Sequence, residues 1–221
     1  MLPKYENEFN EIRGFIKELS QNILKAYRLE LEGFKSRNLL LLDESREILK
    51  EIDSKANEVD NKIIKIFALF EPEAGLLREL VAFLKTTNEL SRIASSGRNY
   101  AKNMKRHIES GVDFTGIEEY MINIHLAAIS ALEFATDIEN STAEYEKKYT
   151  DTLVEENKTD DLFKILEREI LKKVCSKNSD ASEKYINILN LMRKFERVAD
   201  HSVNIAKMFL YAKKGGKIEV Y

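Results

Sequence analysis

The 221-residue chain has few of the residues that interrupt helices. It contains two prolines and eight glycines. Because these residues are the strongest local breaks in regular structure, the sequence favours a small number of long helices. Strand patterning is missing as well, since no sustained alternation of apolar and polar residues is bounded by turns. The chain is therefore predicted to be all-α.

Cysteine is nearly absent. Cys175 stands alone, which excludes an intramolecular disulfide and any metal cluster built on cysteines. A free cysteine usually behaves as a small apolar residue, so we expect Cys175 to be buried or half-buried. This cysteine usage is consistent with a reduced, intracellular compartment.

Long apolar runs and a strong excess of one charge are also missing. The longest strongly apolar stretch, IIKIFALF at residues 63–70, contains a lysine and is far shorter than the roughly 20 residues that cross a bilayer. The acidic first 15 residues do not resemble a signal peptide. A net charge of −3 gives no nucleic-acid footprint. These absences predict a protein that neither inserts into a membrane nor binds nucleic acid.

Apolar residues recur at helical spacing over nearly the whole chain. This period predicts six helices, at residues 5–36, 39–70, 72–109, 117–150, 152–175 and 181–214. The segment SGVDFTG at residues 110–116 has a glycine near each end. We therefore expect this segment to link two groups of three helices.

The two halves of the sequence resemble each other. SRIASSGRNYAK at residues 91–102 aligns with ERVADHSVNIAK at residues 196–207. A repeat of about a hundred residues is much longer than a solenoid unit of about 20–50 residues, so it indicates duplicated domains. We predict two tandem three-helix bundles, at residues 1–110 and 111–221.

Two helices of the second half each carry a pair of carboxylates four residues apart. Residues at this spacing lie on one helix face, and Glu196 and Asp200 fall inside the apolar stripe of the last helix, so we expect them to point toward the bundle interior. Glu156 and Asp160 repeat the pattern one helix earlier. Carboxylates that face a bundle interior repel each other and need cations. Their oxygens suit hard or borderline cations, so these four acids are the candidate metal ligands.

An ordinary ion-pair network is the alternative explanation for these acids. Glu-x-x-x-Asp spacing is common by chance in an acidic chain. The same carboxylates could lie at a polar margin and pair with Arg193, Arg197 or Lys207.

The first half provides an internal comparison, because it has lost most of these acids. Asp60 stands opposite Asp160 and keeps its charge. The residues opposite Glu156, Glu196 and Asp200 are Ala56, Ser91 and Ser95. If a metal explains the acids, the complete site lies in the second half.

These residues resemble the PhoU family, whose accessory proteins act in phosphate signalling. ERVAD at residues 196–200, followed by Asn204 and Ile205, resembles the family's E-R-I-G-D-x-x-x-N-I signature. PEAGLLR at residues 72–78, which follows Asp60, resembles its P-x-A-x-x-L-R segment. The resemblance covers essentially the whole chain.

The resemblance implies a fold and a function. The fold is two repeats of a three-helix bundle. The function is that of a cytoplasmic regulator, often a homodimer and often peripheral to a membrane complex, that is not an enzyme. Such a protein acts as an adaptor between a phosphate ABC transporter and a sensor kinase, and restrains phosphate uptake and phosphate-starvation genes. The implied cofactor is iron or zinc, in a multinuclear cluster, on Glu156, Asp160, Glu196 and Asp200.

Three other functions remain open at this point. The first is an accessory role for a secondary phosphate carrier. The second is a metal-dependent phosphoesterase, since carboxylate-bound metals activate water. The third is a structural bundle with ordinary salt bridges. A ferritin-like oxidase is disfavoured, because no histidine follows a glutamate at Glu-x-x-His spacing. His201 lies off the acidic face and is expected at the surface or in helix packing.

Overall fold

The computed structural model describes residues 3–139, 143–176 and 179–215 of the chain. These residues form seven helices and no strand, which confirms the all-α prediction. The helices are α1 (Pro3–Ser36), α2 (Leu39–Lys50), α3 (Ile52–Leu69), α4 (Ala74–Glu109), α5 (Glu118–Asp137), α6 (Tyr145–Ser176) and α7 (Ser179–Lys214). None of these helices is both long and apolar enough to cross a bilayer.

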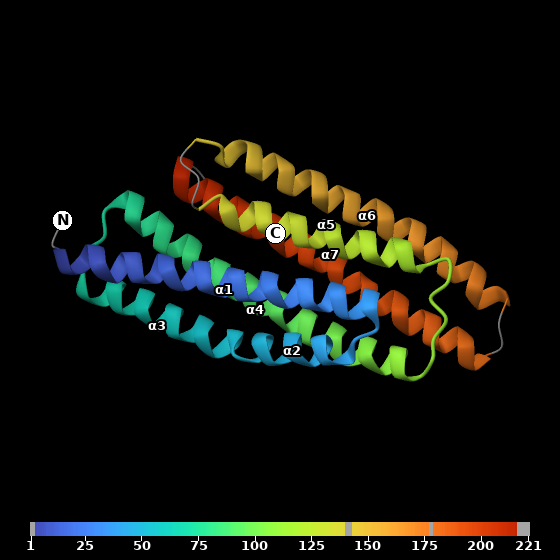
Figure 1. The fold of residues 1–221 in the computed structure, drawn as a ribbon. Helices are drawn as coiled ribbons and strands as arrows, with labels where there is room; N and C mark the ends of the chain where they lie inside the picture. Colours follow the sequence, from blue (N-terminus) through green and yellow to red (C-terminus); the bar gives the residue numbers. More distant parts are fainter. Residues whose placement is uncertain (1–2, 140–142, 177–178, 216–221) are drawn as a thin grey trace.

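The helices are arranged as two tandem bundles that lie side by side along one long axis (Figure 1). In the first bundle α1 and the consecutive helices α2 and α3 pack with α4, and in the second α5, α6 and α7 pack together. The bundles meet where α4 contacts α7 and α1 contacts α5. The predicted pair of three-helix bundles is therefore confirmed, and the two share one continuous hydrophobic core.

The predicted helix at residues 39–70 is interrupted at Glu51, so the prediction of one unbroken helix was wrong. The carbonyl of Leu49 accepts a hydrogen bond from the cap residue Glu51. It accepts a second one from Arg98 Nη1 at 2.9 Å. Arg98 Nη2 also bonds Asp53 Oδ2 at 2.7 Å, just after the break. A side chain of α4 thus holds both sides of the α2–α3 junction.

The predicted boundary at residues 150–152 was also wrong, because α6 begins at Tyr145. Thr150 is the predicted end of one helix and Thr152 the predicted start of the next. Inside α6 their hydroxyls instead donate to the carbonyls of Glu146 and Lys148, at 3.0 Å and 2.8 Å. A threonine hydroxyl that donates to the carbonyl four residues earlier no longer competes for the backbone groups that form the helix. Residues 140–142, which fall inside the predicted helix at residues 117–150, lie outside the described residues.

Cys175 is exposed near the end of α6, contrary to the expectation that it would be buried. One side of the last turns of α6 faces solvent, since Leu171 is 54% exposed. Lys172 is exposed and Val174 only half-buried. A free cysteine is therefore accessible to solvent in this protein.

An aromatic cluster at the centre of the core joins the two bundles. It draws one ring from each of α1, α4, α5 and α7, namely Tyr27, Tyr100, His125 and Phe195. The ring centroids of Tyr100 and Phe195 lie 4.7 Å apart at 80°, an edge-to-face packing that aromatic pairs favour. Burial lowers the pKa of His125 to about 3, so this ring is neutral and serves as a packing residue.

A glutamate is buried next to this cluster. Glu30 on α1 is fully inaccessible, and its Oε1 accepts a hydrogen bond of 2.7 Å from the Ser45 hydroxyl on α2. Its Oε2 has no hydrogen-bond partner in the described structure. Burial raises the pKa of Glu30 well above its ordinary value, although the Ser45 hydrogen bond opposes the shift. An acid in this setting is protonated in the folded protein well above pH 4.5.

We predict that Glu30→Gln stabilises the fold at neutral pH. Glutamine has nearly the shape of a protonated glutamate and carries no proton that must be bound. Because the pKa of Glu30 is raised on folding, the parent loses stability as the pH rises from the unfolded pKa to the folded pKa, by up to about 1.4 kcal/mol per pH unit. The variant's advantage in urea unfolding should therefore grow as the pH is raised above 4.5. Glu32→Gln, at an exposed position of the same helix, is the control and should show no such trend.

Candidate functional site

The four candidate metal ligands lie along the seam between α6 and α7. Glu156 and Asp160 come from α6, and Glu196 and Asp200 come from α7. The first three are half-buried and Asp200 is exposed. The expectation that these carboxylates point into the bundle interior was therefore wrong, because they lie at its rim.

The rim position follows from the packing of α7. This helix contacts α4, α5 and α6, so most of its circumference is covered. Phe195, Val198 and Phe209 are buried, and their directions around the helix are centred more than 90° away from Glu196, at about 100° per residue. Glu196 and Asp200 therefore occupy the edge of the buried face, where α7 meets α6.

The four carboxylates lie close enough together to perturb one another. Burial, and after it the charge of Asp160, raises the pKa values of Glu156 and Glu196. The same two causes, in the same order, raise the pKa of Asp200. Asp160 is thus the acid that acts most strongly on each of the other three. We call these four residues the acidic cluster.

No cation neutralises the acidic cluster directly. Within the parts of the chain that the structure describes, none of its carboxylates makes a hydrogen bond or an ion pair. Arg193, one of the expected partners, lies 3.8 Å from Glu167 and stacks at 4.9 Å over the Phe163 ring. Arg193 and Arg197 lower the pKa of Glu196, and Lys207 lowers that of Glu156, but burial and the charges of the other acids outweigh these effects. In the described ranges, Arg193 and Arg197 therefore do not form the ion pairs with the acidic cluster that the alternative explanation requires.

The acidic cluster has the chemistry of a metal site without a closed shell of ligands. Among the described residues, no three histidine, cysteine, aspartate or glutamate side chains stand close enough to hold a metal ion as placed. The donor set nevertheless consists of carboxylate oxygens, which hard cations prefer. Within the described parts of the chain, no ion pair or hydrogen bond holds these side chains in their present rotamers.

The matching positions of the first bundle lack such a cluster. Ala56 is buried in the core, Ser91 is half-buried and Ser95 is exposed. Asp60 accepts a hydrogen bond of 2.6 Å from the Thr87 hydroxyl on α4. The one carboxylate that remains is therefore satisfied within the bundle.

Sequence reasoning missed an ion pair between the bundles. His201 Nδ1 on α7 lies 2.5 Å from Glu89 Oε2 on α4. Burial acts to raise the pKa of Glu89, but the hydrogen bond and the charge of His201 outweigh it and lower the pKa. A hydrogen bond from Asn204 adds to this lowering. The pair attaches the helix that carries Asp200 to the first bundle.

A family model describes most of the chain. The PhoU domain matches residues 16–104 and again residues 128–209. One match lies in each bundle, from α1 to α4 and from α5 to α7.

Proteins that carry the same description are similar to the chain over nearly its full length. One from Pseudomonas aeruginosa, named a phosphate-specific transport system accessory protein PhoU homolog, is 23% identical and covers 96% of this chain and 86% of its own. A homolog of the same name from Borreliella burgdorferi is 25% identical and covers 98% of both chains.

Solved structures share the fold. The crystal structure of PhoU from Pseudomonas aeruginosa superposes with a TM-score of 0.87 at 20% identity, and covers 96% of this chain and all of its own. The crystal structure of the phosphate transport system regulatory protein PhoU from Streptococcus pneumoniae superposes with a TM-score of 0.80 at 16% identity. The match covers 98% of this chain and all of that one. The arrangement of two bundles is therefore one already seen in crystals.

We predict that Asp160→Asn stabilises the metal-free protein. The substitution removes the charge that acts on the other three acids, and it keeps the shape of the side chain. Since folding raises the pKa values of those acids, their repulsion costs stability at pH 7 and fades as pH falls toward 4. We expect a gain of about 0.5 kcal/mol at pH 7, because the groups are partly exposed and screened.

The measurement is chemical unfolding in the presence of a chelator at pH 7 and at pH 4. Asp161→Asn is the matched control, because Asp161 is exposed on the same helix and pairs with Lys164 at 3.2 Å. It should bring no gain. Equal effects of the two substitutions at pH 7 would show that the acidic cluster is not under mutual repulsion.

Proposed function

Because the chain belongs to the PhoU family, we propose that it is an accessory regulator of a phosphate transport system. The observation that carries the proposal is the pair of PhoU domain matches, one in each bundle. The names of relatives from Pseudomonas aeruginosa and Borreliella burgdorferi support it, since both are phosphate-specific transport system accessory proteins. The role is regulatory rather than catalytic.

In this proposal the protein works in the cytoplasm as a homodimer. It binds at the inner side of a phosphate ABC transporter and connects that transporter to a sensor kinase. When phosphate is plentiful it restrains both phosphate uptake and phosphate-starvation genes. The all-helical surface, without a helix that could cross a bilayer in its described parts, suits a protein that docks on a membrane complex from one side.

Iron or zinc bound by Glu156, Asp160, Glu196 and Asp200 completes the proposal. What supports the metal is the electrostatics of the acidic cluster, whose acids repel one another and have no ion pair. A bound cation would neutralise these charges, and a multinuclear cluster would use more of their oxygens. Since α6 and α7 each supply two ligands, the metal would tie these helices together along their seam.

We predict that the protein, purified without a histidine tag, contains iron or zinc in elemental analysis. Asp160→Asn and Glu196→Gln should each lower the bound metal several-fold, because each removes a charged ligand from the set. Asp161→Asn should retain the parent's metal content, since this residue pairs with Lys164 outside the cluster.

Metal add-back gives a second readout of the same site. Iron(II) or zinc added to the metal-free parent should raise its melting temperature, because a ligand that binds the folded state stabilises it. The rise should be lost in Asp160→Asn, although this variant starts from a more stable fold. Equal rises in the parent and in Asp160→Asn would place metal binding elsewhere in the chain.

We predict that deleting the gene raises phosphate uptake and the activity of a phosphate-starvation reporter in phosphate-rich medium. The parent gene and the Asp161→Asn gene should restore both.

Repeating the uptake assay in cells that lack the ABC transporter separates the alternative functions. If deleting the gene no longer changes phosphate uptake in these cells, the proposal is supported. If deletion still raises uptake, the protein acts on a secondary phosphate carrier. Hydrolysis of a phosphate ester that is lost in Glu196→Gln would instead indicate a phosphoesterase.

A further inference from the structure

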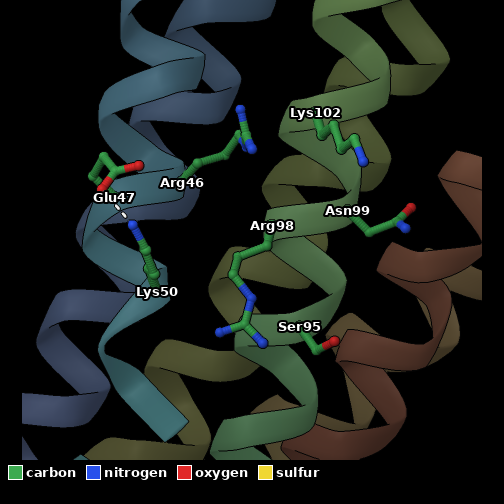
Figure 2. Close-up of a pocket in the computed structure, with 7 residues that line it drawn as sticks. All are labelled: Arg46, Glu47, Lys50, Ser95, Arg98, Asn99 and Lys102. Atoms are coloured by element: carbon green, nitrogen blue, oxygen red, sulfur yellow. Dashed lines mark hydrogen bonds and ion pairs between the residues drawn. The ribbon is translucent and has the colours of Figure 1, made fainter. Parts of the chain in front are cut away.

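A groove between α2 and α4 is lined almost entirely by polar side chains (Figure 2). Its volume is about 420 Å³, which lies within the range of small-molecule pockets. Four of its lining residues are cations, two from each helix: Arg46, Lys50, Arg98 and Lys102. We call this surface the basic groove.

The basic groove has more positive charge than its own acids neutralise. Glu47 is the one carboxylate in the lining, and it lies 3.5 Å from Lys50 Nζ. Arg46 Nη1 lies no closer than 3.7 Å to its acidic neighbour, Asp43. Lys102 is exposed and makes no ion pair with any residue that the structure describes. At least two cations therefore have donors available for a ligand.

Arg98 has a different role from the other cations of the groove. Its guanidinium is held by the Leu49 carbonyl and by Asp53, at the α2–α3 junction. These bonds fix one wall of the groove and keep the positive charge of Arg98 in place. They also mean that Arg98 supports the fold, so a test of ligand binding should leave it unchanged.

The groove occupies the helix face that carries acids in the second bundle. In the alignment of the two halves, Ser95, Asn99 and Lys102 of α4 correspond to Asp200, Asn204 and Lys207 of α7. Ser95 contributes a hydroxyl where α7 has a carboxylate, and Asn99 adds an amide to the lining. One copy of the duplicated face is therefore suited to a cation and the other to an anion.

We propose that the basic groove binds a small anion with several linked phosphates, of the diphosphate or triphosphate class. Arginine and lysine bind phosphate oxygens through charge-assisted hydrogen bonds. The two cations on each helix are four residues apart, which is about 6 Å along the axis, so they form two successive pairs. A single phosphate reaches one pair, whereas a chain of phosphates reaches both.

The lining also indicates what the ligand lacks. No aromatic side chain lines the groove, so a nucleobase has no ring on which to stack. Its apolar surface consists of the stems of long charged side chains rather than a hydrophobic slot. Inorganic diphosphate and triphosphate fit this surface better than a nucleotide with the same phosphates does.

The test is isothermal titration of the metal-free, full-length protein with orthophosphate, diphosphate, triphosphate and ATP. The affinity should rise from orthophosphate to triphosphate, and should fall when the salt concentration is raised, because the contacts are ionic. ATP should bind no more tightly than triphosphate. Tighter binding of ATP would overturn the choice of an inorganic anion, and no binding of triphosphate above that of orthophosphate would overturn the proposal.

Paired variants locate the site. Arg46→Gln combined with Lys102→Gln should weaken triphosphate binding by about tenfold or more, because two charged contacts are lost. Lys164→Gln combined with Lys172→Gln removes the same charge from exposed positions of α6 and should leave the affinity within about twofold. Equal weakening by the two pairs would mean attraction by overall charge alone. Melting temperatures of all variants, measured without ligand, show that each remains folded.

Discussion

The packing of α4 against α7 is the contact on which the rest of the structure depends. Tyr100 of α4 meets Phe195 of α7 edge to face, and Tyr27 and His125 close around them. Neither bundle alone could bury this cluster. α4 and α7 turn these rings toward each other. A second face of α4 therefore packs against α2 and α3, and a second face of α7 packs against α6 (Figure 1). The acidic cluster and the basic groove lie on those faces.

The sequence predicted the helices well because burial imposes a period on each of them, and this signal is local. It failed where a contact from another helix decides the outcome. Glu51 interrupts a strongly helical run because Arg98, from α4, takes the Leu49 carbonyl. The predicted boundary at residues 150–152 failed for a local reason, because the Thr152 hydroxyl donates to the Lys148 carbonyl inside α6. The break at Glu51, by contrast, is not encoded within the few residues that surround it.

The four acids chosen from their spacing lie on the two helices as expected, but their place at the rim of the bundle was not predicted. Spacing alone places Glu196 and Asp200 on one face, and the repeat identifies the face of α6 that accompanies them. How deeply they are buried depends on how many helices cover α7, which no periodicity reveals. The contact between His201 and Glu89 could not be predicted either. It joins α7 to α4 at positions that do not correspond in the alignment of the two halves.

Repulsion within the acidic cluster explains why a duplicated face need not stay alike in both copies. Asp160 makes each of the other three acids costlier to ionise, so a copy that holds no cation gains stability when it loses these charges. Serine at positions 91 and 95 removes that cost from the first bundle. Without these acids, the cations of the same face, such as Lys102, have no carboxylate at positions 91 and 95 to offset their charge. A fold built from two equal bundles can thus present surfaces of opposite charge, each carried by a helix that is anchored in the shared core.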